Sequence, residues 1–305
     1  MKMINNQSIA IIVVNWKKYD LTFKCIDSVL ASSLENFKII LIDNEFQKNK
    51  LSRYSTNKKI KVIKNEKNDG FAKANNQGII YALEKKYDYI LLLNNDTIIR
   101  MDLIEKLVES SLSNNLSIIQ PLILNRNGDK IWNGGGTINK YLGTFNTNLK
   151  DQNFTPNLIF NLEIDWFTGC CCFFNAQVFR DVGLFDENFF AYYEDVDYSL
   201  RLKSKGYVIG LLTNTYLFHY GSMSSKSQNS FGGKLSPYVH YLAVRNHIYL
   251  LKKHSNLFNA FGVFLNQFFK ILSYSFYFFL RLRFVKFKMV YNGLIDGLKM
   301  EQLKK

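Results

Sequence analysis

The first third of the chain alternates short apolar runs with stretches whose apolar residues recur at helical spacing. The runs are rich in β-branched residues, which is typical of strands that are buried on both faces of a sheet. The expected strands are Ile9–Val14, Phe37–Ile42, Ile60–Ile63 and Tyr89–Leu93. Three helices are expected: one that begins after Asp20, one over Gly70–Leu83 and one over Met101–Leu112. This alternation predicts an α/β fold with a Rossmann-like, mostly parallel central sheet flanked by helices.

Polar residues follow several of these apolar runs. Asn15, Asp43 and Asp96 each come where a strand is expected to end. Asp and Asn are common wherever a strand gives way to a loop, so each residue alone has an ordinary explanation. Because the carboxyl ends of parallel strands meet at one edge of a sheet, three such ends predict a ligand site in that crevice.

The second half of the chain carries a weaker pattern. Residues 128–165 contain three consecutive glycines and many polar residues, which indicates loops or a hairpin. Trp166–Phe174 is expected to be a strand with Gly169 inside it, and a glycine there often marks the close approach of a ligand to the backbone. Further expected elements are a helix near Asn175, a helix over Glu194–Lys205, a short strand over Tyr207–Leu212 and a helix from Pro237.

The formal net charge of +14 fits three anionic partners, namely nucleic acid, a nucleotide diphosphate and an acidic lipid surface. The sequence has no nucleic-acid-binding motif, so no specific nucleic-acid partner is expected. The four cysteines are expected to be small apolar side chains in a reduced compartment. Ile9–Val14 is too short to be the apolar part of a signal peptide, which predicts a cytoplasmic protein.

The segment Leu257–Leu280 consists mostly of Phe, Leu, Ile and Tyr and is about as long as a membrane span. Polar residues interrupt it, and a lysine at the bilayer centre costs about 3 kcal/mol. Basic and aromatic residues alternate directly after it, which suits a surface that is apolar on one side and anionic on the other. We expect a helix that lies in the plane of a membrane; a buried helical hairpin and a true span are the alternatives.

Three groups of residues could carry chemistry. Asp96 is well placed to hold Mg²⁺ or Mn²⁺, which take oxygen ligands and often bind through one or two carboxylates plus phosphate oxygens. The acids of Glu194–Asp197 complement a helix N-terminus, but the aromatic run before them would raise the pKa of a carboxylate and suit it to accept a proton. His219 follows the last expected strand, which favours a ligand role over a structural one. Asp197 and Arg201 are four residues apart and are expected to pair.

Taken in order, eight short motifs carry a family resemblance. They are Ile11–Asn15, Leu41–Asn44, Asn68–Gly78, Leu92–Asp96, Trp166–Gly169, Gly183–Glu187, Glu194–Asp197 and His219. This order resembles the inverting family 2 glycosyltransferases of GT-A fold, particularly their bacterial rhamnosyltransferase-like branch. The resemblance covers about residues 8–253.

The resemblance implies roles for single positions. Asp43 would accept the imide N–H of a uracil or thymine base, and the backbone near Asn15 would lie along that base. Asp96 would be the last acid of the metal-binding D-x-D motif, and His219 would be a further ligand of Mg²⁺ or Mn²⁺. Asp195 would deprotonate the acceptor hydroxyl, so that a single displacement inverts the anomeric centre. The other implied nucleotide-binding residues are Gly70, Asn76 and Asn95, and the residues near the donor sugar and acceptor are Trp166 and Gly169.

The sequence departs from the family pattern at three points. Asn94 stands where a strict D-x-D motif has its first acid, which leaves one carboxylate for the metal. Glu45 follows Asp43-Asn44 where a small residue is usual. Glu194 lies beside Asp195 as a supporting acid, and the sequence leaves open which of the two is the base.

The resemblance therefore implies a metal-dependent hexosyltransferase that acts on a lipid-linked oligosaccharide or polysaccharide at the inner face of the plasma membrane. The expected donor is dTDP-rhamnose, with UDP-galactofuranose, UDP-galactose and UDP-glucose as alternatives. A catalytically weak nucleotide-sugar binding protein and a nucleotidyltransferase are the alternatives from other classes. The expected domains are a catalytic domain over residues 1–253, with a nucleotide-binding half 1–125 and an acceptor half 126–253, and a membrane-associating helical tail over 254–305.

Overall fold

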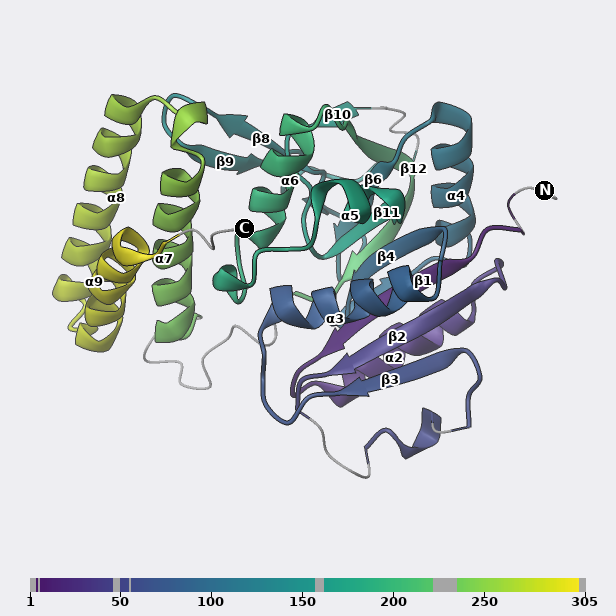
Figure 1. Ribbon diagram of the computed structural model, residues 1–305. Helices are drawn as coiled ribbons and strands as arrows, with labels where there is room; N and C mark the ends of the chain where they lie inside the picture. Colours follow the sequence, from purple (N-terminus) through teal and green to yellow (C-terminus); the bar gives the residue numbers. More distant parts are fainter. Residues whose placement is uncertain are drawn as a thin grey trace. The chain divides into compact units, whose positions relative to one another are not determined.

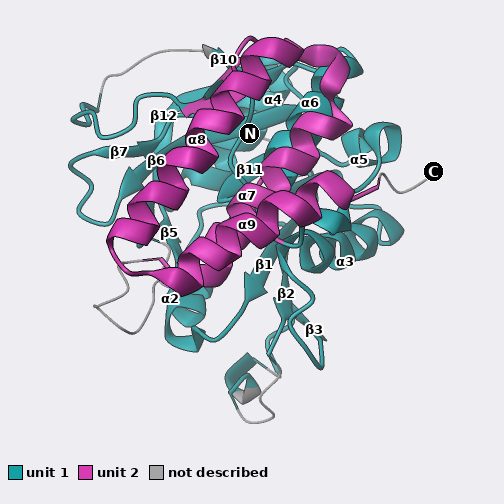
Figure 2. Cartoon of the chain, turned by 90° about the vertical axis from the view of Figure 1, so that its left-hand side faces the viewer, with its two compact units in different colours: residues 1–137, 147–190, 194–224 teal, residues 138–146, 191–193, 225–305 magenta. Residues whose placement is uncertain are grey.

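The computed structural model describes residue 4 and residues 6–45, 50–54, 56–156, 162–221 and 235–301 (Figure 1). The chain divides into two compact units, which are coloured separately in Figure 2. Unit 1 comprises residues 1–137, 147–190 and 194–224, and unit 2 comprises residues 138–146, 191–193 and 225–305. Each unit is described on its own below.

Unit 1 contains a large mixed sheet that is ten-stranded within the described residues, with the main order β10-β12-β6-β11-β4-β1-β2-β3. Its strands β1, β2, β3 and β4 are parallel to one another, as are β6 and β12, while β11 runs antiparallel to both β4 and β6. The main strands are β1 (Ile9–Asn15), β2 (Phe37–Asp43), β3 (Ile60–Lys64), β4 (Tyr89–Asn94), β6 (Ile118–Asn125), β11 (Cys171–Asn175) and β12 (Ile209–His219). The expected mostly parallel central sheet is confirmed.

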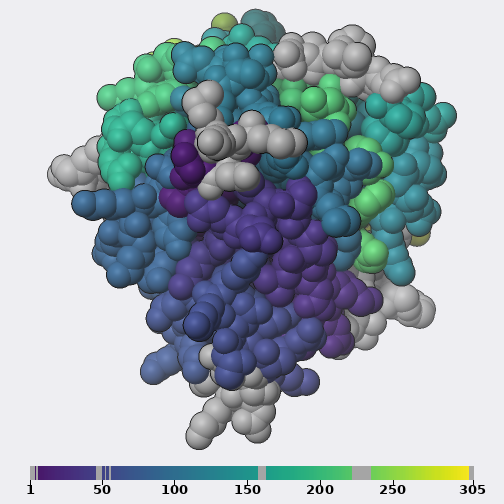
Figure 3. Space-filling view, turned by 90° about the vertical axis from the view of Figure 1, so that its right-hand side faces the viewer, coloured from purple at the N-terminus to yellow at the C-terminus, as the bar shows by residue number. Residues whose placement is uncertain are grey.

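Two apolar clusters lie on opposite faces of this sheet, because successive strand residues point to opposite sides. In β1, Ile9 and Ile11 belong to one cluster, while Ala10 and Ile12 belong to the other. Helices α2 (Tyr19–Leu30) and α4 (Leu103–Asn114) contribute to the first cluster. Helices α3 (Phe71–Glu84), α5 (Gln177–Val182) and α6 (Glu194–Ser204) contribute to the second. The sheet is therefore covered by helices on both faces. In Figure 3 the purple and blue N-terminal segments are gathered in one region of the surface of unit 1.

Short strands occupy much of the region that was expected to form loops or a hairpin. β7 (Ile131–Asn133) pairs with β6, and β10 (Leu162–Ile164) pairs with β12. Another short strand, β5 (Thr97–Ile99), lies outside that region and also pairs with β12. β8 (Gly136–Asn139) and β9 (Thr144–Thr147) form a separate two-stranded sheet.

The strand expected over Trp166–Phe174 is wrong in its first half. Strand β11 begins at Cys171, and Gly169 lies in a turn before it. The physical reason is that the backbone N–H groups here bond to side chains instead of a neighbouring strand. The N–H of Thr168 donates to Gln120 Oε1 at 2.8 Å, and the N–H of Gly169 donates to Asp195 Oδ2 at 2.9 Å.

Two other strands differ from the sequence expectations. β6 was not expected at all, although it lies near the middle of the sheet. β12 extends to His219 instead of ending at Leu212, because a register shift between Leu212 and Tyr216 lets its pairing with β6 continue. His219 is therefore the last residue of a strand, not a residue that follows one.

The four cysteines are free and buried, which confirms that they act as small apolar side chains. Burial raises the pKa of the Cys25 thiol to about 12, so it stays protonated at neutral pH.

Unit 2 contains three long helices, α7 (Pro237–Lys253), α8 (Ala260–Leu280) and α9 (Phe284–Lys299), among its described residues. Val244, Ile248, Phe278 and Val290 form their shared apolar cluster. Gly293 and Gly297 allow α9 to approach α7 closely, because a Cβ at either position would lie 2.6 Å from a carbonyl oxygen of α7.

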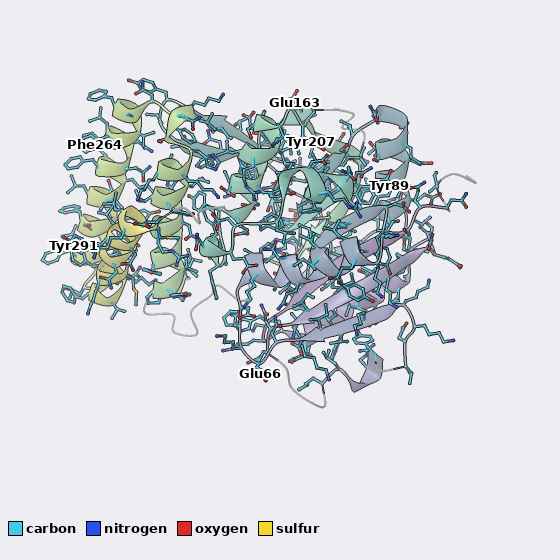
Figure 4. All side chains as sticks on the ribbon, in the orientation of Figure 1. Glu66, Tyr89, Glu163, Tyr207, Phe264 and Tyr291 are labelled. Carbon is cyan, nitrogen blue, oxygen red and sulfur yellow. The ribbon has the colours of Figure 1, made fainter. Side chains whose placement is uncertain are left out.

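Helix α8 is the one helix in the described part of the chain that is long and apolar enough to cross a membrane, with 21 residues and a mean hydropathy of 1.2. These two criteria alone are weak evidence for a span, because core helices of other proteins also meet them. Only 6% of the apolar 18-residue stretch of α8 is buried, however, so α8 is not a core helix. In Figure 4, Phe264 on α8 and Tyr291 on α9 point away from their helices, and their side chains are 64% and 56% exposed.

Candidate active site

The predicted polar residues lie at one edge of the unit 1 sheet. Asn15 and Asp43 are the last residues of β1 and β2 and are register partners. Asn94 ends β4 and pairs with Val14 in β1. His219 ends β12, where it pairs with Thr97 of β5. The parallel direction of these strands thus brings their carboxyl ends to the same edge, as the sequence predicted.

Asn15 and Asp43 form the centre of a buried polar network. Both side chains are fully buried, and Asn15 Nδ2 donates to Asp43 Oδ1 at 2.8 Å. The Tyr19 hydroxyl lies 3.0 Å from Asp43 Oδ2. Thr22 Oγ1 donates to Asn15 Oδ1 at 2.7 Å and accepts from Asn95 Nδ2 at 2.9 Å. The network therefore connects three of the predicted nucleotide-binding residues.

Sequence analysis missed Tyr19 and Thr22. Both lie in the first turn of α2, which leads away from the carboxyl end of β1. Polar residues four to seven positions after Asn15 on the sheet-facing side of that helix are the signal that could have identified them.

Gly70 lies next to this network, at the N-terminus of α3. Its φ is +85°, and a Cβ there would lie 2.6 Å from Phe190, so only glycine fits. The carbonyl of Gly70 accepts from Asn44 Nδ2 at 3.2 Å, which ties the loop to the end of β2.

Asn76 has a different environment. Its amide donates to the carbonyl of Phe185 and to Glu187 Oε1, both at 3.0 Å, and its Oδ1 accepts from the N–H of Phe185 at 3.0 Å. These bonds fix the segment before α6 against α3. The structure therefore does not join Asn76 to the network of Asn15 and Asp43, and its contact with a nucleotide stays a prediction.

Asp96 and His219 come together from different parts of the chain. His219 Nε2 lies 3.2 Å from Asp96 Oδ1, and the side chains are 4% and 12% exposed. The N–H of Tyr220 donates to the carbonyl of Asp96 at 2.8 Å, which holds the two strand ends together. The other ring nitrogen of His219, Nδ1, is buried and has no hydrogen-bond partner in the described part of the chain.

This pair fits a divalent cation with an incomplete set of protein ligands. Carboxylates bind divalent cations such as Mg²⁺ and Mn²⁺, and imidazole groups bind divalent transition-metal ions. Among the described residues, no group of three or more His, Cys, Asp or Glu side chains gathers to hold a metal ion. The Asp96–His219 pair therefore offers two side chains as ligands of a cation.

Asp195 lies in the first turn of α6, and its carboxylate is held by backbone N–H groups. Oδ2 accepts from Gly169 at 2.9 Å, and Oδ1 accepts from Val196 at 2.9 Å. Desolvation by burial raises the pKa of Asp195, although these hydrogen bonds act in the opposite direction. The structure thus brings together Gly169 and Asp195. The close approach at Gly169 is made by the ring of Phe71, which would lie 3.0 Å from a Cβ at this position, whereas Asp195 Oδ2 would lie 3.7 Å from it.

The other two acids of this turn have less access to solvent. Asp197 is 0% exposed and forms an ion pair with Arg201 at 3.0 Å, as the sequence predicted. Glu194 is 5% exposed, whereas Asp195 is partly exposed. Asp195 is therefore the acid of the three that a ligand could reach.

Trp166 is packed against Gly136, where a Cβ would overlap the indole ring. Its side chain is 8% exposed, and Nε1 is buried without a hydrogen-bond partner among the described residues. A buried indole donor of this kind has a free energy cost unless a ligand or water accepts from it.

The chain is similar in sequence to known proteins. The model of the family described as "Glycosyl transferase family 2" matches residues 8–183. The low-salt glycan biosynthesis hexosyltransferase Agl10 of Haloferax volcanii is 29% identical over 207 residues, which are 66% of this chain and 64% of that protein. The dTDP-rhamnosyl transferase RfbF of Shigella flexneri is 26% identical over 259 residues, which are 82% of this chain and 81% of that protein.

Two solved structures share the fold. GalNAc-T7 with UDP, GalNAc and Mn²⁺ has a TM-score of 0.59 and 16% identity, and the match covers 81% of this chain and 48% of that one. S. aureus TarS 1–349 in complex with UDP has a TM-score of 0.52 and 13% identity, with 80% of this chain and 65% of that one covered. At such low identity these structures establish the similarity of fold alone.

Proposed function

The chain belongs to glycosyl transferase family 2, and on that premise we propose that it transfers a sugar from a nucleotide-sugar donor to a glycan acceptor. One observation carries the proposal. The Asn15–Asp43 network, the Asp96–His219 pair and the Asp195 carboxylate all belong to the carboxyl edge of one sheet or the helix start beside it. Such an edge is where open α/β sheets bind their ligands.

The nucleotide end of the donor would lie at β1 and β2. The Asp43 carboxylate lies at the carboxyl end of β2 and accepts hydrogen bonds from Asn15 and Tyr19, and it would accept the imide N–H of a uracil or thymine base. The best candidate for the donor is dTDP-rhamnose, supported by the similarity to RfbF. UDP-galactofuranose, UDP-galactose and UDP-glucose are the alternatives.

Asp96 and His219 would hold a Mg²⁺ or Mn²⁺ ion, and the buried Nδ1 and Nε2 of the imidazole give two candidate donor atoms. When bound, the ion would neutralise negative charge on the leaving diphosphate. The similarity in fold to GalNAc-T7, which was crystallised with Mn²⁺, is consistent with this proposal.

Asp195 would act as the general base, with Glu194 as its supporting neighbour. A carboxylate oxygen of Asp195 takes the proton from the acceptor hydroxyl, and the hydroxyl oxygen forms a bond to the anomeric carbon of the donor. The bond from that carbon to the diphosphate breaks, and the diphosphate leaves with the electron pair. Attack opposite the leaving group inverts the anomeric centre. The raised pKa of Asp195 brings it nearer to neutral pH, where a general base works best.

Trp166 and Gly169 would line the side of the site that faces the donor sugar and the acceptor. The buried Nε1 of Trp166 offers a donor to a sugar hydroxyl, and Gly169 fixes the base. Within this proposal, residues 1–253 form the catalytic domain, with a nucleotide-binding half over 1–125 and an acceptor half over 126–253. Residues 254–305 form the membrane-associating tail.

We also propose that the acceptor is a lipid-linked oligosaccharide or polysaccharide, reached from the inner face of the plasma membrane. The support comes from α8, whose apolar residues face outward. Its polar residues instead bond within unit 2: Asn266 Nδ2 donates to the carbonyl of Leu142 at 3.0 Å, and Lys270 Nζ lies 2.8 Å from His247 Nδ1. The outward apolar residues include Phe261, Phe264, Phe268, Leu272, Phe276 and Phe279, all more than half exposed. An outward face of this kind is stable in contact with lipid rather than water.

A panel of nucleotide sugars, each with Mg²⁺ or Mn²⁺, tests the proposal through thermal stabilisation and release of the nucleotide diphosphate. We expect one dTDP- or UDP-sugar to be hydrolysed in a metal-dependent reaction. Asp195→Asn should lower that rate by about 10²–10⁴-fold while nucleotide binding is kept. Asp129→Asn, at an exposed position of the same unit, is the control and should act as the wild type.

Two results would contradict the proposal. Normal turnover by Asp195→Asn would exclude that residue as the base. Metal-dependent binding of a nucleotide sugar with no hydrolysis and no transfer would favour the second candidate, a catalytically weak nucleotide-sugar binding protein. One observation favours this second candidate. The Asp96–His219 pair contains a single carboxylate, because Asn94 stands in place of an acid.

A further inference from the structure

We infer that Asn246, on α7, is a positioning residue that holds the chain segment directly before α6, the helix that carries the base Asp195. This inference rests on the proposed function, because it assigns Asn246 a role in the reaction that Asp195 would carry out. Asn246 is fully buried, and it acts through the backbone of residues 191 and 192.

The segment before α6 has an unusual backbone. Phe190, Tyr192 and Tyr193 have φ values of +61°, +73° and +71°, a region that residues with a Cβ rarely adopt. Phe190 also has a ψ of −62°, which is the conformation of a rare and strained tight turn. Three such residues among four persist only where the surroundings hold them in place, and residues of this kind occur preferentially at functional sites.

Asn246 supplies such a constraint. Its Nδ2 donates to the carbonyl of Ala191 and to the carbonyl of Tyr192, both at 2.8 Å. Its Oδ1 accepts from Arg245 Nε at 2.8 Å, which fixes the orientation of the amide. Both carbonyl groups belong to the segment with positive φ values, so the amide bridges two peptide units that a relaxed backbone would turn apart.

His247, the next residue of α7, fixes the end of the same segment. Its ring stacks on that of Tyr193 with centroids 5.1 Å apart and an interplanar angle of 5°. Burial, with a contribution from Lys270, lowers the pKa of His247 to about 3, so the ring is neutral at physiological pH. A neutral ring can donate from Nε2 to the carbonyl of Gly143 at 2.8 Å and accept at Nδ1 from Lys270 at 2.8 Å. The His247 ring, on which Tyr193 stacks, is thus held by a hydrogen bond at each of its two nitrogen atoms.

The start of the segment is held separately, within unit 1. The carbonyl of Phe190 accepts from the N–H groups of Phe71 and Ala72, at the N-terminus of α3. These residues directly follow Gly70, which the proposed function places near the nucleotide. Phe190 is therefore held by hydrogen bonds within unit 1, and residues 191 and 192 are held by hydrogen bonds within unit 2.

The covalent distance from this segment to the base is short. Tyr193 is followed by Glu194, which starts α6, and Asp195 is the second residue of that helix. Release of the two carbonyl groups at 191 and 192 would let the first turn of α6 shift, and with it the hydrogen bond from Gly169 to Asp195. A displacement of about 1 Å of a catalytic group can lower the rate of a reaction about 10²-fold.

The test compares Asn246→Ala and Asn246→Asp with the wild type. Asp keeps the shape of the side chain but removes both donors and places its carboxyl oxygens against the two carbonyl groups, so both variants should release the segment. We expect kcat for Mn²⁺-dependent hydrolysis of dTDP-rhamnose, with UDP-galactose as a second probe, to fall about 10²-fold in both variants, with KM for the donor unchanged. Asn266→Ala is the matched control, because it also removes one amide-to-carbonyl hydrogen bond from unit 2, and its kcat should stay normal.

Hydrogen exchange gives a readout that does not depend on activity. The carbonyl groups that Asn246 binds share their peptide units with the N–H groups of Tyr192 and Tyr193, so these two amides should exchange at least tenfold faster in Asn246→Ala than in the wild type, while those of α3 are unchanged. Equal exchange of these two amides in the folded variant and the wild type would overturn the inference.

The two proposals fail in different ways. If Asp195→Asn keeps normal turnover, the proposed base is wrong, whatever Asn246 does. If Asp195→Asn is inactive but Asn246→Ala and Asn246→Asp keep a normal kcat, only the positioning role is wrong.

Discussion

The outward face of α8 gives a prediction whose magnitude can be worked from the structure. The perturbation is the double substitution Phe264→Ser and Phe268→Ser, which leaves the contacts of α8 with α7 and α9 in place. Both rings lie on the outward side, with 64% and 53% of their surface exposed. The substitution should therefore change the affinity for a membrane while stability stays nearly constant.

The size of the effect follows from the area of the two rings. A Phe side chain has roughly 200 Å² of surface, so each ring exposes about 100–130 Å². At about 25 cal/mol per Å², transfer of both rings from water to lipid is worth about 5–6 kcal/mol. If half of that area enters the lipid, the loss is about 2.5 kcal/mol, or roughly 70-fold in the partition coefficient.

The assay is co-sedimentation of the full chain with vesicles that contain 30% anionic lipid, at about 0.15 M salt. The wild type should bind, and the double variant should bind about two orders of magnitude more weakly. The control is Met101→Ser, because Met101 is 63% exposed but lies in unit 1, and its loss should not matter. Melting temperatures of all three proteins confirm that the fold is kept.

Unchanged vesicle binding by the double variant would refute the reasoning, because the apolar face would then contribute nothing. No binding by the wild type would refute the membrane proposal as a whole. Binding that disappears for neutral vesicles but survives the double substitution would attribute the association to charge alone, as basic residues such as Arg281 and Lys288 could provide.

Three further predictions concern unit 1. Because its pKa in the folded state is raised, Asp195 binds its proton more tightly in the folded than in the unfolded chain, so its ionisation costs stability as the pH rises. Thermal melts should show that Asp195→Asn is more stable than the wild type at pH 7 and that the difference shrinks toward pH 4. Urea unfolding of Asp197→Asn should show a loss of about 3 kcal/mol, because Arg201 would keep a partly buried charge without its partner. Calorimetry should show that Asp96→Asn and His219→Ala each weaken Mn²⁺ binding in the presence of UDP or dTDP by at least tenfold, while nucleotide binding without metal is unchanged.

The sequence was sufficient for the elements that depend on local pattern. β1 and β4 are continuous apolar runs up to their last residue, β2 is one apart from Lys38, and the ends of all three were located to within one residue. Since parallel strands of a doubly wound sheet end at one edge, the convergence of Asn15 and Asp43 followed from the pattern. The pairing of Asp96 with His219 was expected only from the family resemblance, because 122 residues of intervening chain carry no local signal.

Features that depend on contacts between distant residues could not be predicted from the sequence. β6 contains Gln120 and Pro121, which argue against a strand in the middle of a sheet. Gln120 is nevertheless fully buried, because its side chain bonds to Asn133 and to the backbone of Thr168. The same contacts divert the backbone before β11 and turn the N–H of Gly169 toward Asp195.

The tail shows why an average over a segment can mislead about a surface. Asn266 and Lys270 lower the mean hydropathy of α8 to 1.2, and in the sequence they argued against a membrane span. In the structure both bond within unit 2, to Leu142 and His247, and so they take no part in the outward face. The outward face is therefore more apolar than the average of the helix. A helix with its polar side chains turned toward its own protein and its aromatic rings turned outward is arranged for an apolar neighbour, and this favours a helix that lies along a membrane over a buried hairpin.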